Sequence, residues 1–350
     1  MSATPSLSPL GTPEAWYFVG LGAELAAGAV RVVRLAGEDW VLWRGMDGMA
    51  SLTASTCPHL GAHLGEGGTV QGNELRCPFH GFRFSTSGQC TATGYDTKPP
   101  RAVLRALPLQ EKNGLLFVWW SGCEAAPTWE VPEVDMAGWS PFQVDHWSMP
   151  GHPQETTENS VDHGHFGWIH GYSDVRVLRE IRAEGPLLEG RYAFKRPLVR
   201  GVSWLPLLSE EFDFEVWGLG YTRVEVFDQT AGLRIRLLVM ATVTEPGEVE
   251  LHVAASVLDL DRTEGFLRHL PTAMVRPILV PIVLSAFRGE VEQDAVIWKR
   301  KRYLPQPALA RGDGPVAMYR AWAKQFYGNP SPAVPDAALE VPLGDGGKEN

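Results

Sequence analysis

The sequence predicts an α+β protein of two domains: an all-β domain, then a domain with a curved antiparallel sheet and a long helix. From Ala15 to about Val118 the chain consists of short apolar runs separated by Gly, Asp and Pro, a pattern typical of short strands and tight turns. Longer strand-like segments and a helical section follow. A chain of 350 residues has room for about two domains.

The first domain is predicted over residues 13–122 and the second over residues 130–328. Strands are expected at Val30–Leu35, Trp40–Trp43 and Leu115–Trp120, because these runs are apolar and bounded by turn residues. Ser121 to Pro132 lacks a periodic pattern and contains two prolines, which indicates a linker. Residues 329–350 are rich in Pro, Ala, Gly and Asp, and this composition predicts a disordered tail.

The second domain opens with a helical window at Glu155–His170. Five strand-like segments come next: Tyr192–Val199, Glu211–Val216, Thr222–Phe227, Leu233–Val243 and Val249–Leu258. Strands that follow one another without long connections favour one curved antiparallel sheet. The stretch from Asp261 to Lys299 predicts a long helical section, kinked or divided at Pro271, Pro277 and Pro281.

Composition and charge exclude some classes of function. Apolar residues make up 44% and charged residues 21%, which is typical of a globular protein. The net charge of −10 argues against a nucleic-acid-binding protein, which needs a basic face. No stretch reaches the roughly 18–20 apolar residues that a membrane-spanning helix requires. The start of the chain also lacks the pattern of a signal peptide.

The most informative motif is a pair of Cys/His knuckles. Cys57-Pro58-His59 and Cys77-Pro78-Phe79-His80 each contain one thiolate and one imidazole donor. Two Cys and two His divided between two irons form the ligand set of a Rieske [2Fe–2S] cluster. The alternative is structural zinc, which also uses Cys2His2 sets. Zinc fingers usually place both Cys in one knuckle and both His in the other, so the order found here favours the cluster.

The remaining cysteines, Cys90 and Cys123, are predicted to be free thiols. A protein that holds a metal cluster normally lies in a reducing compartment, where disulfides are rare. A cytoplasmic location is therefore expected.

A second group of metal-ligand residues lies in Glu158–His170. Non-haem Fe(II) oxygenases use two His and one carboxylate and keep open positions for O2 and substrate. His165 and His170 are the candidate His ligands. Their spacing of five does not suit a regular helix, but a helix widened by one residue would bring them together.

The carboxylate ligand is expected from the late helix. Asp294 is the candidate, with Glu290 and Glu292 as alternatives that spacing alone does not separate. His163 points away from His165 on a helix and is expected to be structural or solvated. Phe166 and Trp168 are expected to belong to the core or to a pocket wall.

In this order, the two groups resemble the pattern of the Rieske non-haem iron oxygenases. The pattern C-x-H…C-x-x-H maps onto Cys57, His59, Cys77 and His80. The pattern D-x-x-H-x-x-x-x-H followed by a late Asp maps onto Asp162, His165, His170 and Asp294. The resemblance covers about residues 13–305. It implies an N-terminal Rieske β domain and a C-terminal helix-grip (START-like) domain, an antiparallel sheet wrapped around a long helix.

The residues around the two knuckles indicate a subgroup within this family. C-P-H-L-G-A-x-L-G-x-G-G-T-V-x-G, then C-P-F-H-G-F-x-F, and later Gln293-Asp294, Ile297-Trp298 and Lys301-Arg302-Tyr303 are similar to Neverland-type cholesterol 7-desaturases. The 3-ketosteroid 9α-hydroxylases are also similar. The start of this sequence departs from that of the desaturases, and we expect a protein without their membrane anchor.

The resemblance implies an oxygenase component that oxidises a hydrophobic sterol or steroid with O2. Electrons would come from NAD(P)H through a reductase and, in some systems, a ferredoxin. It also implies a head-to-tail homotrimer in which Asp162 bridges a mononuclear-iron His and a cluster His of the neighbouring subunit. A carboxylate that accepts an imidazole N–H fixes the tautomer of the ring.

The sequence is compatible with more than one substrate and with two other classes of function. A pocket wall is expected from Trp204–Leu208, Trp217–Leu219 and Ile278–Phe287, although these segments also suit a plain core. An aromatic or other small substrate is an alternative. A Rieske electron carrier without catalytic iron, or a zinc-bound interaction protein, would be a different class of function.

Overall fold

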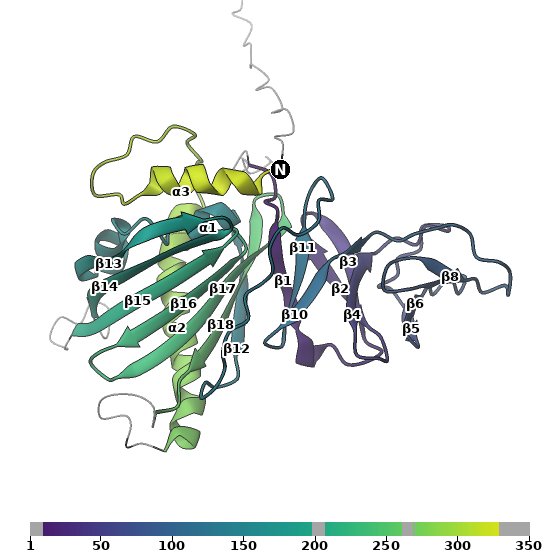
Figure 1. Ribbon diagram of the computed structural model, residues 1–350, viewed down its shortest axis with the longest axis horizontal. Helices are drawn as coiled ribbons and strands as arrows, with labels where there is room; N and C mark the ends of the chain where they lie inside the picture. Colours follow the sequence, from purple (N-terminus) through teal and green to yellow (C-terminus); the bar gives the residue numbers. More distant parts are fainter. Residues whose placement is uncertain (1–9, 198–206, 261–268, 270, 329–350) are drawn as a thin grey trace, which may run out of the picture.

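The computed structural model describes residues 10–197, 207–260, 269 and 271–328. Two bodies lie side by side along its long axis (Figure 1). A domain of short strands contains residues 15–120, and a second domain has a seven-stranded sheet crossed by a long helix, α2. The predicted α+β fold with a sheet around a helix is confirmed.

Three small antiparallel sheets form the first domain. Their strand orders are β1-β11-β10, β2-β3-β4-β9 and β5-β6-β7-β8. The bounds are β1 Ala15–Leu21, β2 Val30–Leu35, β3 Glu38–Arg44, β4 Ala50–Ala54, β5 Thr69–Gln71, β6 Glu74–Arg76, β7 Arg83–Phe84, β8 Cys90–Ala92, β9 Ala106–Leu107, β10 Leu109–Lys112 and β11 Leu115–Trp120, with a 3-10 turn at Gly22–Glu24. All three strands predicted here are present.

The second domain is built on one antiparallel sheet of order β12-β18-β17-β16-β15-β14-β13. Its strands are β12 Gln143–Pro150, β13 Ser173–Glu184, β14 Leu187–Pro197, β15 Leu207–Trp217, β16 Tyr221–Asp228, β17 Leu233–Glu245 and β18 Glu248–Val257. The five strands expected from sequence form its centre. The sequence prediction missed the two edge strands, β12 and β13, because polar residues interrupt both and leave no apolar run.

Helix α2 spans Thr272–Trp298 as one element and packs on β18 and β12. Pro277 and Pro281 lie inside it and do not divide it, contrary to one of the two outcomes expected from the sequence. Both prolines are exposed. Among the described residues, no helix is long and apolar enough to cross a membrane.

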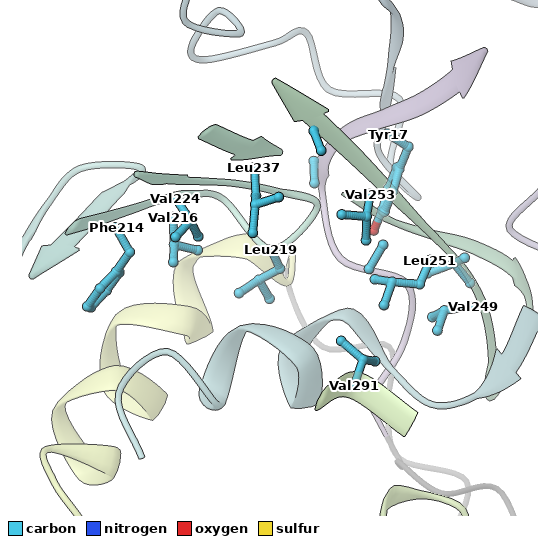
Figure 2. Packing of buried hydrophobic residues seen from close by; sticks show 14 of the residues in the cluster. Tyr17, Phe214, Val216, Leu219, Val224, Leu237, Val249, Leu251, Val253 and Val291 are labelled. Atoms are coloured by element: carbon cyan, nitrogen blue, oxygen red, sulfur yellow. The ribbon is translucent and has the colours of Figure 1, made fainter. Parts of the chain in front are cut away.

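Apolar side chains line the space between the sheet and α2. In Figure 2, Val291 lies on the helix side, with Val224 and Leu237 on the strand side and Leu219 between them. All four are less than a tenth exposed. Burial of such side chains stabilises each by roughly 1.5–3 kcal/mol. The helix that carries the candidate carboxylates is therefore fixed by packing.

The two domains share a packed boundary. The Thr242 hydroxyl donates to the carbonyl of Phe18 at 2.7 Å, and the Phe18 ring lies 4.8 Å from the His252 ring. Trp129, in the predicted linker, accepts a hydrogen bond from the Trp16 indole at 2.8 Å.

The helix α1 (Pro153–Glu158) is capped by a buried histidine. His152 accepts a hydrogen bond from the Gln154 N–H at 3.1 Å through Nδ1, and its Nε2 lies 3.1 Å from the Gly11 carbonyl. Burial lowers the pKa of His152 from 6.5 to about 4. The sequence reasoning assigned this histidine no role.

We expect the stability of the protein to fall in mild acid through His152. Unfolding takes up a proton between the two pKa values, so stability is full above about pH 6.5 and is lost as the pH falls towards about 4. Thermal unfolding measured between pH 7.5 and 5 should show this slope. His152→Asn keeps a cap acceptor that does not titrate, and it should flatten the slope. An unchanged slope in His152→Asn would contradict the assignment to His152.

Candidate metal centres

Two loops with the same geometry carry the Cys/His knuckles. In each loop the Cys N–H donates to the carbonyl five residues later, Cys57 to Ala62 and Cys77 to Phe82, both at 2.8 Å. In each, the glycine four residues after the Cys donates its N–H back to the Cys carbonyl. Two such turns place a thiol and an imidazole at equivalent points.

The donors of the two loops face each other. Cys57 and Cys77 are buried, and the His59 and His80 rings lie 4.8 Å apart and are half-buried. The Phe82 ring stacks on His59 at 4.2 Å. Burial and the neighbouring Cys77 thiol raise the pKa of Cys57 to about 11. Buried sulfur on one side and accessible imidazole on the other suit a cluster with one all-Cys and one all-His iron.

The two loop glycines offer a test of this geometry. Gly61 and Gly81 have φ of 77° and 68°, where an L side chain costs roughly 1–2 kcal/mol. A Cβ at Gly81 would also lie 3.2 Å from the Gly94 Cα, whereas one at Gly61 would meet nothing within 4 Å. We expect Gly81→Ala to lower cluster occupancy, read from visible absorption, more than Gly61→Ala. Equal losses of cluster occupancy in the two variants would contradict the close packing at Gly81.

The second group of donors lies between α1 and β13. A π-helix, η2 (Phe166–His170), starts directly after His165. The widened turn expected from the five-residue spacing is therefore present, and it brings the His165 and His170 rings to 5.2 Å. The helical window expected at Glu155–His170 is not continuous, because α1 ends at Glu158 and the π-helix starts at Phe166.

Asp294 of α2 completes a group of three donors. One ligand atom from each of His165, His170 and Asp294 lies within 4.8 Å of the other two. His170 Nε2 lies 3.6 Å from Asp294 Oδ1. Of the two alternative carboxylates, Glu292 is mostly exposed beside Arg288, whereas Glu290 lies on the other side of the His170 ring, with Oε2 2.9 Å from Nδ1.

The Nδ1 atoms of both imidazoles face oxygen atoms of the protein. His165 Nδ1 contacts the Asp162 carbonyl, and the Asp162 carboxylate lies 3.7 Å from the same nitrogen. Burial and nearby His170 lower the pKa of His165 to about 4, so this ring is neutral at pH 7, as a metal ligand must be. Burial and nearby Glu290 raise the pKa of Asp294 to about 6.

The sequence reasoning missed the residues that hold this group in place. The Asn159 amide donates to Asp294 Oδ2 at 3.0 Å. Glu158 pairs with Arg320 at 2.6 Å, and Tyr319 donates to the Gln154 carbonyl at 2.9 Å, so helix α3 (Val316–Ala323) braces α1. A 3-10 turn, Lys324–Phe326, follows α3. Only the position of Asn159 inside the motif could have indicated its role.

A cavity of about 410 Å³ reaches all three donors. The predicted wall segments contribute part of it, through Leu208, Leu219 and five residues of Ile278–Phe287. Residues 204–206 lie outside the described residues. Phe166 lines the cavity, but Trp168 is 92% exposed, so the prediction of a core or wall position for Trp168 is wrong. It follows Gly167 on the outer side of the π-helix.

Comparison with known families shows which family the chain belongs to. The family model for the 3-ketosteroid 9alpha-hydroxylase C-terminal domain matches residues 118–327, and that for the Rieske [2Fe–2S] domain matches residues 15–107. The chain is a Rieske oxygenase. It belongs to the family that includes the 3-ketosteroid 9α-hydroxylases.

Curated relatives agree with this assignment. The Rieske oxygenase is 28% identical to a cholesterol 7-desaturase of Bombyx mori over 343 residues, covering 95% of this chain and 73% of that protein. It is 25% identical to a 3-ketosteroid-9-alpha-monooxygenase oxygenase component of Rhodococcus rhodochrous, covering 95% and 88%. It is therefore an oxidoreductase of the oxygenase and desaturase type.

Solved structures share the fold. Dicamba monooxygenase bound to dicamba superimposes with a TM-score of 0.65 at 18% identity, over 90% of this chain and 97% of that one. NdmA of Pseudomonas putida CBB5 with caffeine gives 0.65 at 17%, over 88% and 89%.

The donor sets of this Rieske oxygenase fit the cofactors of its family, a [2Fe–2S] cluster and a mononuclear iron with O2 as co-substrate. The first site has two buried thiols and two imidazoles. The second has two imidazoles and one carboxylate beside a cavity, the set of an open non-haem Fe(II) site.

Proposed function

We propose that this Rieske oxygenase hydroxylates or desaturates a sterol or steroid with O2. The observation that carries the proposal is the cavity, which is lined mainly by apolar side chains and runs to His165, His170 and Asp294. Its volume of about 410 Å³ lies within the range of small-molecule sites. Relatives named for cholesterol and for 3-ketosteroids support the substrate class.

The ligand assignments are part of this proposal. Cys57, His59, Cys77 and His80 would hold the cluster. His165, His170 and Asp294 would hold the iron, which when bound supplies O2 activation with electrons from the cluster. Asn159 and Asp162 orient two of these ligands through the contacts described above.

The cavity wall would select the substrate and exclude water. Strands β14 to β18 contribute one side and α2 the other, through apolar side chains such as Phe194, Leu237 and Val283. Removing a rigid ring system from water would contribute about 25 cal/mol per Å² before the cost of association. The polar part of the wall includes Arg196 and Glu210, whose ion pair is 2.8 Å long. These groups would suit a polar substituent on an otherwise apolar substrate.

An oxygenase component works with a reductase or ferredoxin partner. We propose that NAD(P)H supplies the electrons through that partner. The described cysteines are all free, including Cys90 and Cys123, and this supports a reducing, cytoplasmic setting.

A head-to-tail homotrimer is proposed for electron transfer. In Figure 1 the sheet β5–β8, which flanks the Cys/His loops, and the strand β13, which follows the π-helix, lie at opposite ends of the molecule. A ring of subunits would bring the cluster of one chain to Asp162 of the next. Light scattering should give three times the chain mass, and an active monomer would contradict the ring.

Turnover of a sterol and steroid panel with a surrogate reductase, read by mass spectrometry, tests the function. Gain of one oxygen atom indicates hydroxylation, and loss of two hydrogens indicates desaturation. Iron analysis should give about three irons per chain, whereas an electron carrier without catalytic iron would hold about two. Turnover of aromatic acids or methylxanthines alone would favour a non-steroid substrate, as in the structures with dicamba and caffeine.

A further inference from the structure

Glu290 lies behind one of the candidate iron ligands. Its Oε2 is 2.9 Å from His170 Nδ1, whereas His170 Nε2 points to Asp294 Oδ1 at 3.6 Å. Both atoms of the closer pair are buried, and neither makes a hydrogen bond within the described residues, so their contact is an ion pair by distance alone. The Glu290 carboxylate thus lies at Nδ1 of the His170 ring, and the Asp294 carboxylate lies at Nε2 of the same ring.

The helix geometry explains this arrangement. Glu290 and Asp294 are four residues apart on α2, so they project from one face of it. His170 is the last residue of the π-helix and is 7% exposed. Its ring lies against Tyr172 at 5.3 Å, which limits rotation away from the helix. A ring in this position presents Nε2 to a metal only if Nδ1 carries the proton and has an acceptor.

We propose that Glu290 is a positioning residue that holds His170 with Nδ1 protonated and Nε2 directed at the iron, which deepens the proposed function and rests on it. A carboxylate acceptor behind a metal-bound imidazole fixes the tautomer and raises the basicity of the ligand. The main-chain carbonyl of Asp162 occupies the matching place behind His165. Each imidazole of the site then has its own oxygen at Nδ1, one from the motif backbone and one from α2.

The surroundings of Glu290 favour this role over that of a third ligand. Ligation through Glu290 would require its carboxylate to leave Nδ1 and to reach the Nε2 side, where Asp294 already lies. Asp294 is held there by Asn159. Arg196 and Tyr172 are close enough to Glu290 to interact with it electrostatically.

The test compares Glu290→Gln, Glu290→Ala and Asp294→Asn, with Glu292→Gln as the matched control on the exposed side of α2. The Fe(II) affinity of the second site is measured after selective removal of its metal, and the EPR spectrum of the Fe(II)–nitric oxide adduct is recorded. Visible absorption of the cluster verifies that each variant is folded.

Glu290→Ala should weaken Fe(II) binding about 10- to 100-fold and alter the EPR rhombicity. Glu290→Gln keeps an acceptor for Nδ1–H and should recover part of the affinity. Asp294→Asn should lose the iron, and Glu292→Gln should match the parent protein.

Unchanged affinity and EPR spectrum in Glu290→Ala would overturn the positioning role while leaving the proposed function intact. Loss of iron in Glu290→Gln as complete as in Asp294→Asn would overturn it too, because Glu290 would then be a ligand. If the parent protein bound no third iron, the proposed function itself would fail.

Discussion

Replacing His165 with Ala is expected to abolish turnover and to lower the iron content from about three to about two atoms per chain. His165 is one of only two imidazoles in the three-donor group of the described structure, and its ligand atom lies within 4.8 Å of the others. A site left with one His and one carboxylate would bind Fe(II) weakly. The cluster, which we propose is bound by the Cys/His loops of the other domain, should be retained.

Iron analysis and the EPR spectrum of the reduced cluster measure the two centres separately. His163→Ala is the matched control, since its half-buried ring contacts Tyr192 at 5.8 Å and is not part of the donor group. It should retain both metals and most of the activity. If His165→Ala turned over substrate at the parent rate, a catalytic iron bound by His165 would be excluded.

Replacing Asp162 with Asn is expected to retain both metals but to reduce turnover by two orders of magnitude or more. The contact between Asp162 and His165 Nδ1 runs through the main-chain carbonyl, which the substitution keeps, so the iron ligand stays oriented. The carboxylate is more than a third exposed, and it is the part available to a cluster His of a neighbouring subunit. Asn would leave the electron path without a charged acceptor.

Single-turnover kinetics should place the defect of Asp162→Asn in electron transfer from the reduced cluster to the iron. Asp174→Asn is the control, because it removes an exposed carboxylate just beyond the motif, where Asp174 pairs with Arg176 and Lys195. Full activity in Asp162→Asn would exclude the bridge, whereas loss of iron would make Asp162 a structural support of His165.

Much of this architecture was predictable because it depends on local patterns. The alternation and apolar runs of the central strands predicted the sheet, and the five-residue spacing of His165 and His170 predicted a widened helix. The edge strand β13 was missed, because most of its residues face solvent and offer no periodic burial. The position of Trp168 was predicted wrongly because it is apolar and lies beside buried residues. It lies within the π-helix, on the side that faces solvent.

The third carboxylate shows where sequence reasoning stopped. Glu290, Glu292 and Asp294 all lie near the end of α2, and only the rotation of the helix against η2 separates them. Glu292 points to solvent, whereas Glu290 and Asp294 point to opposite nitrogens of His170. That rotation is set by packing against β12 and β18, contacts that no short motif encodes.

The brace formed by α3 on α1 has a consequence for the order in which the protein matures. The cluster loops end by residue 82, so they emerge from the ribosome before α2 and α3 and can fold with their own small sheets. The proposed iron centre includes Asp294 from α2, and Arg320 and Tyr319 of α3 hold α1 in place. Cluster insertion can therefore begin on a nascent chain, whereas iron loading at the proposed site must wait until α3 has been made.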